Sequence, residues 1–352
     1  MHRGWAGENQ GIGAHSDERT GPRCWWLSWV SGVVAVGLLV LWAWSPRDLP
    51  DHGTVQVTFL DVGQGDAALV ETSDGRAMLI DGGGASESYD LGRVAVAPLL
   101  WDRGIRRLDV VVATHPQQDH IGGLAFVVDK FQIGEFWTNG VVREAAFFHR
   151  VEEALHRRHV MVRAVSDAEQ EVVFGACHIR VMNPRRESRA GLVEASGKQL
   201  NNRSVVFRLE CGGTVLLFTG DIEQEAEASL VRSGESLKAS VLKVPHHGAR
   251  GSVDESFLRA VHPQVAVVSV GAGNPYGHPA PDMLEAYSRL GIQVLRTDRN
   301  GAVMVVGADQ GVRFSCESGR RLTRVRLESI GSGKMEGQNL RRLLLGTTSC
   351  ST

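Results

Sequence analysis

The stretch that decides the fold reads VATHPQQDHIGG and runs from Val112 to Gly123. It continues the valine-rich run at 108–113, which predicts a buried strand. His115, Asp119 and His120 then follow within six positions of one loop. Two imidazoles and a carboxylate, held close together at the end of a strand, provide the ligands that a metal ion needs. The stretch therefore predicts a metal site, against the alternative of a polar loop with incidental histidines.

The length and composition are those of a folded protein with one large domain or two ordinary ones. The chain has 352 residues, of which 43% are hydrophobic and 22% are charged, and these values exclude a disordered chain. The net charge of −2 argues against a strongly basic nucleic-acid binder, although local arginine clusters could contact phosphates. The five cysteines are far apart and form no CxxC, so neither a disulfide framework nor a thiolate zinc site is indicated.

The first 54 residues divide into a tail, an apolar segment and a linker. Residues 1–23 are rich in glycine and mixed in charge, which predicts disorder. Residues 24–45 carry no charge and have tryptophans near both ends, and about 20 apolar residues can span a bilayer. A core helix is rarely so uniformly apolar, and a signal peptide has a shorter apolar core. We therefore expect a transmembrane helix at 24–45, followed by a breaker-rich linker at 46–54.

The arginines around the apolar segment predict its orientation. Arg3, Arg19 and Arg23 precede the segment and Arg47 follows it, which favours an N-terminus inside the cell. We therefore expect a single-pass protein of the cell membrane whose domain, residues 55–318, lies outside the cytoplasm. Residues 319–352 are expected to form a basic, flexible tail.

Apolar runs in the domain repeatedly end in acids or histidines. Such residues follow predicted strands at five places: Asp81, 115–120, Asp221, 246–247 and His278. A carboxylate such as Asp221, placed after a fully apolar run, costs too much unless it is paired, hydrogen-bonded or bound to a metal. If the strand ends share one edge of a sheet, the side chains converge. Carboxylates and imidazoles without thiolates suit zinc or manganese.

A polar segment at 183–199 interrupts this pattern. It contains Arg185, Arg186 and Arg189. Such a loop is usually a solvated surface, but near an active site its arginines could contact phosphates.

These motifs together resemble the metallo-β-lactamase fold and, within it, the C-terminal hydrolase domain of ComEC-type DNA-internalisation competence channels. The motifs are FLDVGQGDA at 59–67, LIDGG at 79–83, THPQQDHIGG at 114–123, TGD at 219–221, LKVPHHG at 242–248 and YGHP at 276–279. The likeness covers roughly residues 55–314. It implies an α/β fold, a four-layer αββα sandwich, here preceded by one apolar segment instead of the family's bundle of transmembrane helices.

The resemblance also implies a set of metal ligands. His115, Asp119 and His120 match the first, fifth and sixth places of the superfamily motif H-x-H-x-D-H, but Gln117 stands where the motif has its second histidine. Asp221 matches the acid that bridges two metals. The final histidine of the pattern is best matched by His247, with His246 as its rival. Four residues are expected to support the ligands from behind, and these are Asp61, Asp81, Asn202 and Ser204.

One metal subsite is therefore complete and the other is depleted. The complete subsite contains Asp119, His120, Asp221 and His247. The depleted subsite has His115, the shared Asp221 and Gln117, whose neutral amide is a weak ligand. We expect one tightly held zinc or manganese ion and a second ion that binds loosely or only with substrate.

The mechanism implied is metal-assisted hydrolysis at phosphorus. Asp119 or Asp221 would orient the attacking water. His278 and Lys243 would steady the phosphate or the leaving oxygen, although Lys243 could equally be a plain charge at a strand edge. The predicted function is a membrane-anchored, metal-dependent nuclease or phosphodiesterase that acts on DNA, with single-stranded DNA as the expected substrate.

Two alternatives remain open at this stage. The first is a hydrolase of the same fold that acts on a small phosphoester or another ester. The second is a non-catalytic protein that handles DNA for a separate uptake channel. Salt-sensitive binding of DNA separates the predicted function from the first alternative, and metal-dependent turnover separates it from the second.

Overall fold

The computed structural model describes residues 49–168, 171–186, 197–251, 254–308, 311–317 and 322–326, together with Gly32 and Val34. The predicted tail at 1–23 lies outside these residues, and so does the predicted transmembrane helix at 24–45 apart from Gly32 and Val34. Within the described ranges, no helix is both long enough and apolar enough to cross a membrane.

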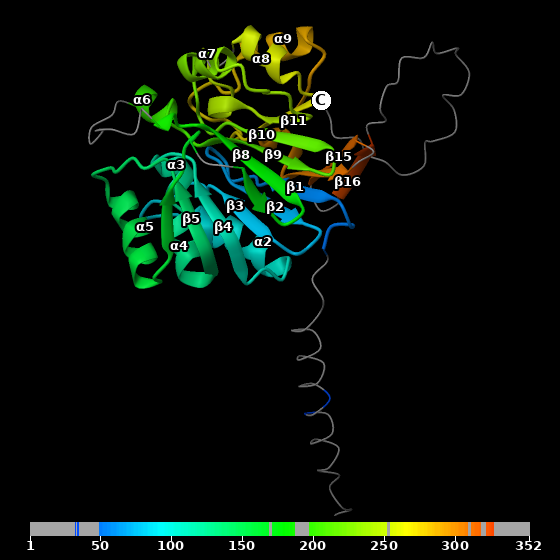
Figure 1. Ribbon diagram of the computed structural model, residues 1–352. Coiled ribbons are helices and arrows are strands. Elements are labelled where there is room, and N and C mark those ends of the chain that lie inside the picture. Colours follow the sequence, from blue (N-terminus) through cyan, green and yellow to red (C-terminus); the bar gives the residue numbers. More distant parts are fainter. Residues whose placement is uncertain are drawn as a thin grey trace, which may run out of the picture. The chain divides into compact units, whose positions relative to one another are not determined.

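Two β-sheets form the centre of the domain (Figure 1). The first has the strand order β16-β15-β14-β1-β2-β3-β4-β5-β6 and the second β13-β12-β11-β10-β9-β8-β7. The strands of the first sheet are β1 (Val55–Phe59), β2 (Ala68–Thr72), β3 (Ala77–Ile80), β4 (Arg107–Ala113), β5 (Gln132–Thr138), β6 (Met161–Ala164), β14 (Val303–Ala308), β15 (Gly311–Glu317) and β16 (Leu322–Arg326). Those of the second are β7 (Val172–Phe174), β8 (Cys177–Asn183), β9 (Val206–Cys211), β10 (Thr214–Phe218), β11 (Val241–Lys243), β12 (Val265–Val268) and β13 (Gln293–Arg296).

Helices cover the outer face of each sheet (Figure 1). The first sheet is covered by η1 (Gly92–Val96), α2 (Ala97–Asp102), α3 (Gln118–Ile121), α4 (Leu124–Lys130) and α5 (Ala146–Arg157). The second is covered by α7 (Gln224–Arg232), α8 (Glu255–Val261) and α9 (Pro281–Arg289). Three short elements lie in the connections: α6 (Gly197–Asn201), η3 (Pro245–Gly248) and α10 (Thr297–Asn300). The two-sheet α/β sandwich that the resemblance implied is confirmed.

Alternation along the strands explains why the layers form. In β3, Met78 and Ile80 pack into the core between the two sheets, whereas Ala77 and Leu79 pack against the helices. Successive side chains of a strand point to opposite faces, so a strand that is apolar at every position must be covered on both sides. The continuous apolar runs of the sequence therefore become the inner strands of a layered structure.

The direction of the strands positions the site. Strands β3 and β4 run parallel in the first sheet, and β10, β11 and β12 run parallel in the second. Parallel strands deliver their C-terminal ends to the same edge of a sheet, where α/β proteins usually bind their ligands. The loops that follow these strands carry the acids and histidines singled out in the sequence.

The first sheet extends beyond the boundary predicted at residue 318. Strand β16 pairs antiparallel with β15, with Phe314 opposite Val325. It lies in the segment 319–352 that the sequence analysis expected to be a flexible tail. Leu322 and Val325 give the run some strand propensity, but the basic composition of the segment obscured this signal.

A disulfide joins Cys177 on β8 to Cys211 on β9. The two residues lie directly opposite each other in the antiparallel pair, with their Cα atoms 4.4 Å apart, a separation that suits a disulfide. The spacing of the cysteines indicated no disulfide framework, and this interpretation is wrong for this pair. Because 34 positions separate the cysteines, only the pairing of the strands brings them together.

Candidate metal centre

Three imidazole rings meet where the two sheets bring their strand ends together. His115 and His120 come from the segment after β4, and His247 comes from η3, after β11. All three side chains are almost completely buried. Their Nε2 atoms are also buried, and none has a hydrogen-bond partner within the described residues. A buried polar atom without a partner costs free energy, so three in one place require an explanation.

The second nitrogen of each ring is held from behind. The Nδ1 contacts are Thr114 Oγ1 at 3.1 Å for His115, Asp81 Oδ2 at 2.8 Å for His120, and the Ser269 carbonyl at 2.9 Å for His247. Asp81 also accepts hydrogen bonds from the Thr114 amide at 2.8 Å and the Thr114 hydroxyl at 2.7 Å. Oxygen acceptors at Nδ1 favour the tautomer that leaves the lone pair on Nε2, the arrangement common behind metal-ligating histidines.

Two carboxylates face the free nitrogens. Asp221 Oδ2 lies 3.2 Å from His120 Nε2 and 3.3 Å from His247 Nε2. Asp119 Oδ2 lies 3.6 Å from His247 Nε2 and 3.9 Å from His120 Nε2. The Asp221 side chain is 1% exposed and that of Asp119 is 36% exposed, so Asp221 forms the floor of the site and Asp119 lies on its open side.

These atoms fit a divalent cation. The ligand atoms of His115, His120 and Asp221 all lie within 4.8 Å of one another, and so do those of Asp119, His120 and His247. The two groups share His120. Imidazole nitrogens and carboxylate oxygens without a thiolate are a donor set for zinc or manganese, and an ion would satisfy the three unpartnered Nε2 atoms.

The carboxylates control the charge of the imidazoles. Burial alone would lower the pKa of His247, but the nearby carboxylates, Asp221 foremost, outweigh it and raise that pKa to about 10. Burial and the neighbouring His120 lower the pKa of His115 to about 3. Burial would raise the pKa of Asp221, but His120 and His247 hold it well below its usual range. A metal ion would thus take the place of protons on His120 and His247.

Lys243 lies beneath this cluster. Its Nζ pairs with Asp66 and lies 3.8 Å from Asp221 Oδ1, and its side chain is 5% exposed. Burial would lower the pKa of Lys243, but the Asp66 carboxylate outweighs it and raises the pKa. In this position Lys243 compensates buried carboxylates and does not face the open side. The expectation that Lys243 steadies a phosphate is therefore at odds with its position.

Asp66 was not among the predicted supporting residues, whereas Asp61 from the same glycine-rich turn was. Asp61 is exposed and accepts a hydrogen bond from the Gly63 amide of its own turn at 3.2 Å. Asp66 is 5% exposed, and its ligand atoms group with those of Asp221 and His247. The expected supporting role thus moves from Asp61 to Asp66. The signal for Asp66 was the buried-strand lysine, Lys243, which needs an acidic partner.

The other two predicted supporting residues hold the loop that carries Asp221. The Ser204 hydroxyl accepts a hydrogen bond from the Asp221 amide at 3.0 Å. Asn202 Oδ1 accepts one from the Glu223 amide at 2.8 Å. The segment after α6 therefore fixes the backbone on both sides of the ligand.

Gln117 and His246 lie on one flank of the centre. Gln117 Nε2 donates a hydrogen bond to Asn201 Oδ1, and Asn201 Nδ2 donates one to Glu223 Oε1 at 3.0 Å. His246 Nε2 lies 3.9 Å from Asp221 Oδ2, farther than either His120 or His247. The structure thus groups His247 with the buried ligand atoms and places its rival His246 outside them.

The two adjacent histidines adopt an unusual backbone conformation. His246 has φ 48° and ψ 46°, and His247 has φ 53° and ψ 19°. Both residues lie in the left-handed region, which is uncommon for residues other than glycine, although histidine enters it more often than most. This conformation directs two successive rings toward the centre from one short turn.

His278 lies at the rim. Its ring centroid is 5.8 Å from that of His246 and 6.4 Å from that of His247. Burial, and the neighbouring His247, lower the pKa of His278 to about 4. His278 is therefore neutral at physiological pH, and its Nδ1 has no partner within the described residues.

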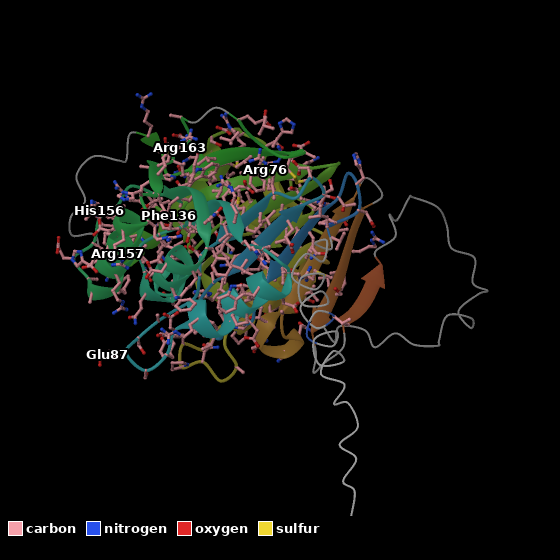
Figure 2. The ribbon with its side chains drawn as sticks, turned by 90° about the horizontal axis from the view of Figure 1, so that it is seen from below. Arg76, Glu87, Phe136, His156, Arg157 and Arg163 are labelled. Atoms are coloured by element: carbon pink, nitrogen blue, oxygen red, sulfur yellow. A yellow bond between two sulfur atoms is a disulfide. The ribbon has the colours of Figure 1, made fainter. Side chains whose placement is uncertain are left out.

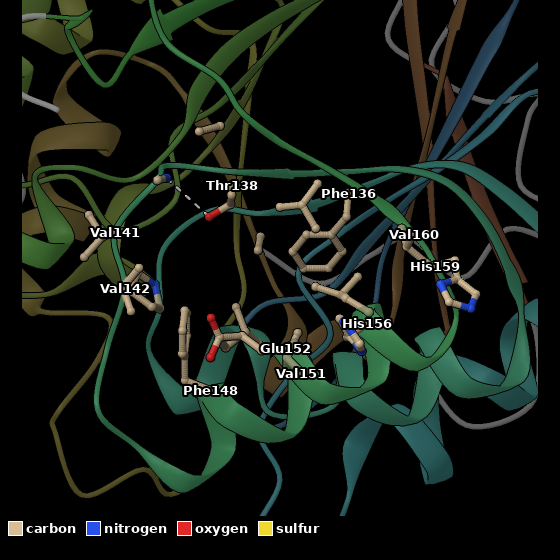
Figure 3. A pocket seen from close by; sticks show the side chains of 17 residues that line it. Phe136, Thr138, Val141, Val142, Phe148, Val151, Glu152, His156, His159 and Val160 are labelled. Carbon is tan, nitrogen blue, oxygen red and sulfur yellow. Dashed lines mark hydrogen bonds between the residues drawn. The ribbon is translucent and has the colours of Figure 1, made fainter.

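A separate cavity of about 670 Å³ lies between α5 and the β5–β6 end of the first sheet (Figure 3). Apolar side chains such as Phe136, Val151 and Val160 point into it, whereas His156 and His159 lie at one end. Figure 2 shows Phe136 and His156 at the same end of the molecule. The cavity borders Pro116, the neighbour of His115, but takes in none of the ligand atoms described above.

Comparisons with known proteins agree with this geometry. Residues 60–188 match the Metallo-beta-lactamase superfamily. The chain is 31% identical over 261 residues to ComE operon protein 3 of Bacillus subtilis, covering 70% of this chain and 32% of that protein. It is 32% identical over 262 residues to competence protein ComA of Neisseria gonorrhoeae, covering 74% of this chain and 33% of that protein. The chain thus spans about a third of the length of the curated relatives it matches.

Among solved structures, a metallo hydrolase from the archaeon Ignicoccus hospitalis is 16% identical to this chain with a TM-score of 0.45, and the match covers 71% of this chain and 98% of that one.

Proposed function

Because the chain carries a metallo-β-lactamase domain and its homologues are competence proteins, we propose that it is a metal-dependent phosphodiesterase that hydrolyses DNA during DNA uptake. The observation that carries this proposal is the group of three buried Nε2 atoms, none with a hydrogen-bond partner within the described residues, that gathers with the carboxylates of Asp119 and Asp221. An arrangement of this kind costs stability in a protein that does not use it. It therefore favours a hydrolase over a protein that only handles DNA.

The exposure of each residue indicates its role in the proposed hydrolysis. A divalent cation held by either ligand group, that of His115, His120 and Asp221 or that of Asp119, His120 and His247, would lower the pKa of a water and polarise a phosphoryl oxygen. Asp221 is closed off on the floor and keeps the ligand geometry. Asp119 reaches the open side, where its carboxylate can orient the attacking water and accept its proton. His278, neutral and at the rim, can donate a hydrogen bond to the leaving oxygen.

A half-buried arginine beside the ligand loops supports a phosphate substrate. The Arg203 carbonyl accepts a hydrogen bond from Asn139 at 3.1 Å, and the neighbouring Val205 amide donates one to the Thr114 carbonyl at 2.8 Å. Within the described ranges, the Arg203 guanidinium forms no ion pair. By contrast, Arg185 is paired with Asp167 at 3.5 Å. The backbone at Arg203 thus lies close to the segment that carries His115, and its guanidinium, which has no ion pair within the described residues, is a candidate contact for a phosphate.

We propose in addition that the protein is anchored by residues 24–45 with its hydrolase domain outside the cytoplasm. The arginines around the apolar segment support this orientation, and so does the Cys177–Cys211 disulfide, because disulfides persist in oxidising compartments. Alkaline phosphatase and β-galactosidase reporters fused after Ser315 test the proposal. We expect activity from the phosphatase fusion. Activity from the β-galactosidase fusion alone would reverse the orientation.

The catalytic proposal is tested on the full-length chain purified in detergent. We expect bound zinc or manganese by elemental analysis, and cleavage of DNA that is lost with a chelator and restored by the metal. DNA binding should weaken steeply with salt, because neutralising each phosphate releases counterions. Metal-dependent cleavage of small phosphoesters without cleavage of DNA would favour the hydrolase of small esters. Metal-loaded protein without any turnover would contradict the enzymatic proposal.

A further inference from the structure

We propose that Tyr276 is a stacking platform for the nucleobase next to the phosphate that the metal centre binds. This inference rests on the proposed function, because it names how that site would recognise its substrate.

The first observation is a series of three rings that leads from a metal ligand to solvent. The His247 and His278 rings are stacked with centroids 6.4 Å apart and an interplanar angle of 21°. The His278 and Tyr276 rings are stacked with centroids 5.7 Å apart and an interplanar angle of 29°. Offset stacks at these separations are favourable for aromatic rings. Tyr276 therefore continues the stack outward from the centre.

The second observation is the exposure of Tyr276. The residue is 67% exposed, while the ring before it, His278, is only partly exposed. The outer part of the tyrosine ring is thus open to solvent. A large exposed aromatic side chain contributes little to folding, and aromatic residues with one free face are the usual contacts for unstacked bases.

The third observation is that the loop carrying Tyr276 is held in place. Asn274 Nδ2 donates hydrogen bonds to the Gly271 carbonyl at 3.0 Å and to the His278 carbonyl at 2.7 Å. Asn274 Oδ1 accepts a hydrogen bond from the His278 amide at 3.0 Å. This clamp closes the loop around Tyr276, so the ring is presented in a fixed position and a base that stacks on it loses little further freedom.

The same loop packs against the turn that supports the centre. The Gly271 amide donates a hydrogen bond to Gln64 Oε1 at 3.4 Å, and a Cβ at position 271 would lie 2.7 Å from the Gln64 amide nitrogen. Only glycine permits this approach. The turn that contains Gln64 also carries Asp66, so the loop that carries Tyr276 packs directly against a turn that supports the metal centre.

The chemistry of this surface selects a flexible strand. A base can stack on Tyr276 only when it has left its own neighbours, which is easy in single-stranded DNA and costly in a duplex. Stacking tolerates all four bases, because each offers a π face. The platform therefore predicts a preference for single strands or frayed ends, with little dependence on sequence.

The test uses the full-length, metal-loaded protein with a single-stranded oligonucleotide and the same oligonucleotide lacking one base beside the scissile phosphate. Tyr276→Ala should raise KM for the intact strand by about 5- to 150-fold, the value of one stacked base, and Tyr276→Phe should restore it. The abasic strand should be bound weakly by the unchanged protein and no more weakly by Tyr276→Ala. Trp101→Ala, which removes another exposed aromatic ring at α2, is the matched control.

A second readout reports stacking directly. We expect the fluorescence of 2-aminopurine at the same position to be quenched on binding to the unchanged protein and to Tyr276→Phe, and not on binding to Tyr276→Ala. If the protein cleaves DNA but Tyr276→Ala behaves like the unchanged protein on both strands, the stacking inference is wrong and the proposed function stands. If no variant cleaves DNA in the presence of metal, the proposed function fails first.

Discussion

Two buried carboxylates, six positions apart in the chain, have opposite surroundings. Asp221 and Glu227 are each 1% exposed. Asp221 lies among imidazoles at the end of β10, and His120 and His247 outweigh its burial and hold its pKa well below the usual range. Glu227 lies on α7, and burial raises its pKa to about 8, because its hydrogen bond from the Asp254 amide at 2.9 Å compensates only in part and the nearby carboxylates of Asp254 and Glu223 add to the rise.

The difference shows what distinguishes a site from a core position. Burial disfavours the charged form of both carboxylates. At Asp221, positive partners reverse the penalty and keep a charge in the interior, whereas Glu227 avoids the penalty by retaining its proton. A buried acid is therefore a candidate for function when oppositely charged groups surround it, and burial by itself is not sufficient.

The largest expected effect comes from removing the charge at the floor of the centre. Asp221→Ala should abolish metal content and lower hydrolysis by more than the roughly 10- to 100-fold loss typical of changing an outer partner of a metal ligand. Elemental analysis and initial rates measure both. Asp61→Ala, which removes an exposed acid of a neighbouring turn, should leave both unchanged. Full metal stoichiometry in Asp221→Ala would show that the ligand set is wrong.

The second largest effect is expected from breaking the ion pair between Lys243 and Asp66, which should affect folding stability. Lys243→Met leaves Asp66 buried without its lysine partner, with the His120 and His247 rings 3.7 and 3.6 Å away, and should lower the free energy of unfolding of the metal-free protein by about 3–5 kcal/mol. Denaturant titration measures the change. Lys243→Met combined with Asp66→Asn should recover much of the loss, because the unpaired charge is gone. A single variant as stable as the unchanged protein would argue against this pairing.

Glu227 should make the free energy of unfolding depend on pH. Its pKa of about 8 in the folded state exceeds that of a glutamate in an unfolded chain, about 4.3. The unfolded chain therefore loses this proton first, and the free energy of unfolding falls as pH rises from about 4 to 8, by an amount on the order of a few kcal/mol. Glu227→Gln should remove this fall.

Urea titrations at pH 5 and pH 9 compare Glu227→Gln with the unchanged protein. Glu225→Gln, which replaces an exposed acid on the same helix, should keep the full pH dependence. Identical pH dependence in Glu227→Gln and the unchanged protein would mean that another group is responsible.

The smallest expected effect concerns the flank of the centre. Because the Gln117 amide is engaged by Asn201 and amides are weak ligands, calorimetric titration should show one tight metal per chain and a second that binds weakly. Gln117→His should raise the affinity of the second step by about tenfold, or 1.4 kcal/mol, and leave the first step nearly unchanged. Two equally tight ions in the unchanged protein would show that Gln117 is not the weak point.

Local patterns were enough to locate the strands and most of the centre. The apolar runs that end at Asp81, His115 and Asp221 predicted strands with polar ends, because the signal for a strand lies in the pattern of neighbouring residues. The four-layer arrangement came from the resemblance. The motif that His246 and His247 share predicted a histidine ligand, best matched by His247, but the sequence left His246 as its rival.

What the sequence missed depends on distant parts of the chain. Asp66 and Asp61 share one turn, and only the arrival of Lys243 from another strand separates their roles. The Cys177–Cys211 disulfide needs the pairing of β8 and β9. The cavity beside α5 depends on how side chains from several elements pack together, which no short sequence pattern predicts.

At the left-handed turn of His246 and His247, the residue that would be best for folding stability differs from the residue that metal binding needs. The left-handed conformation of each residue destabilises the folded protein by an amount on the order of 1–2 kcal/mol, a cost that glycine would not have. Random substitution screened only for heat resistance would therefore be drawn toward glycine at these two positions. Such variants would gain stability and lose the ring that completes the ligand set, so at this turn folding stability and metal binding favour different residues.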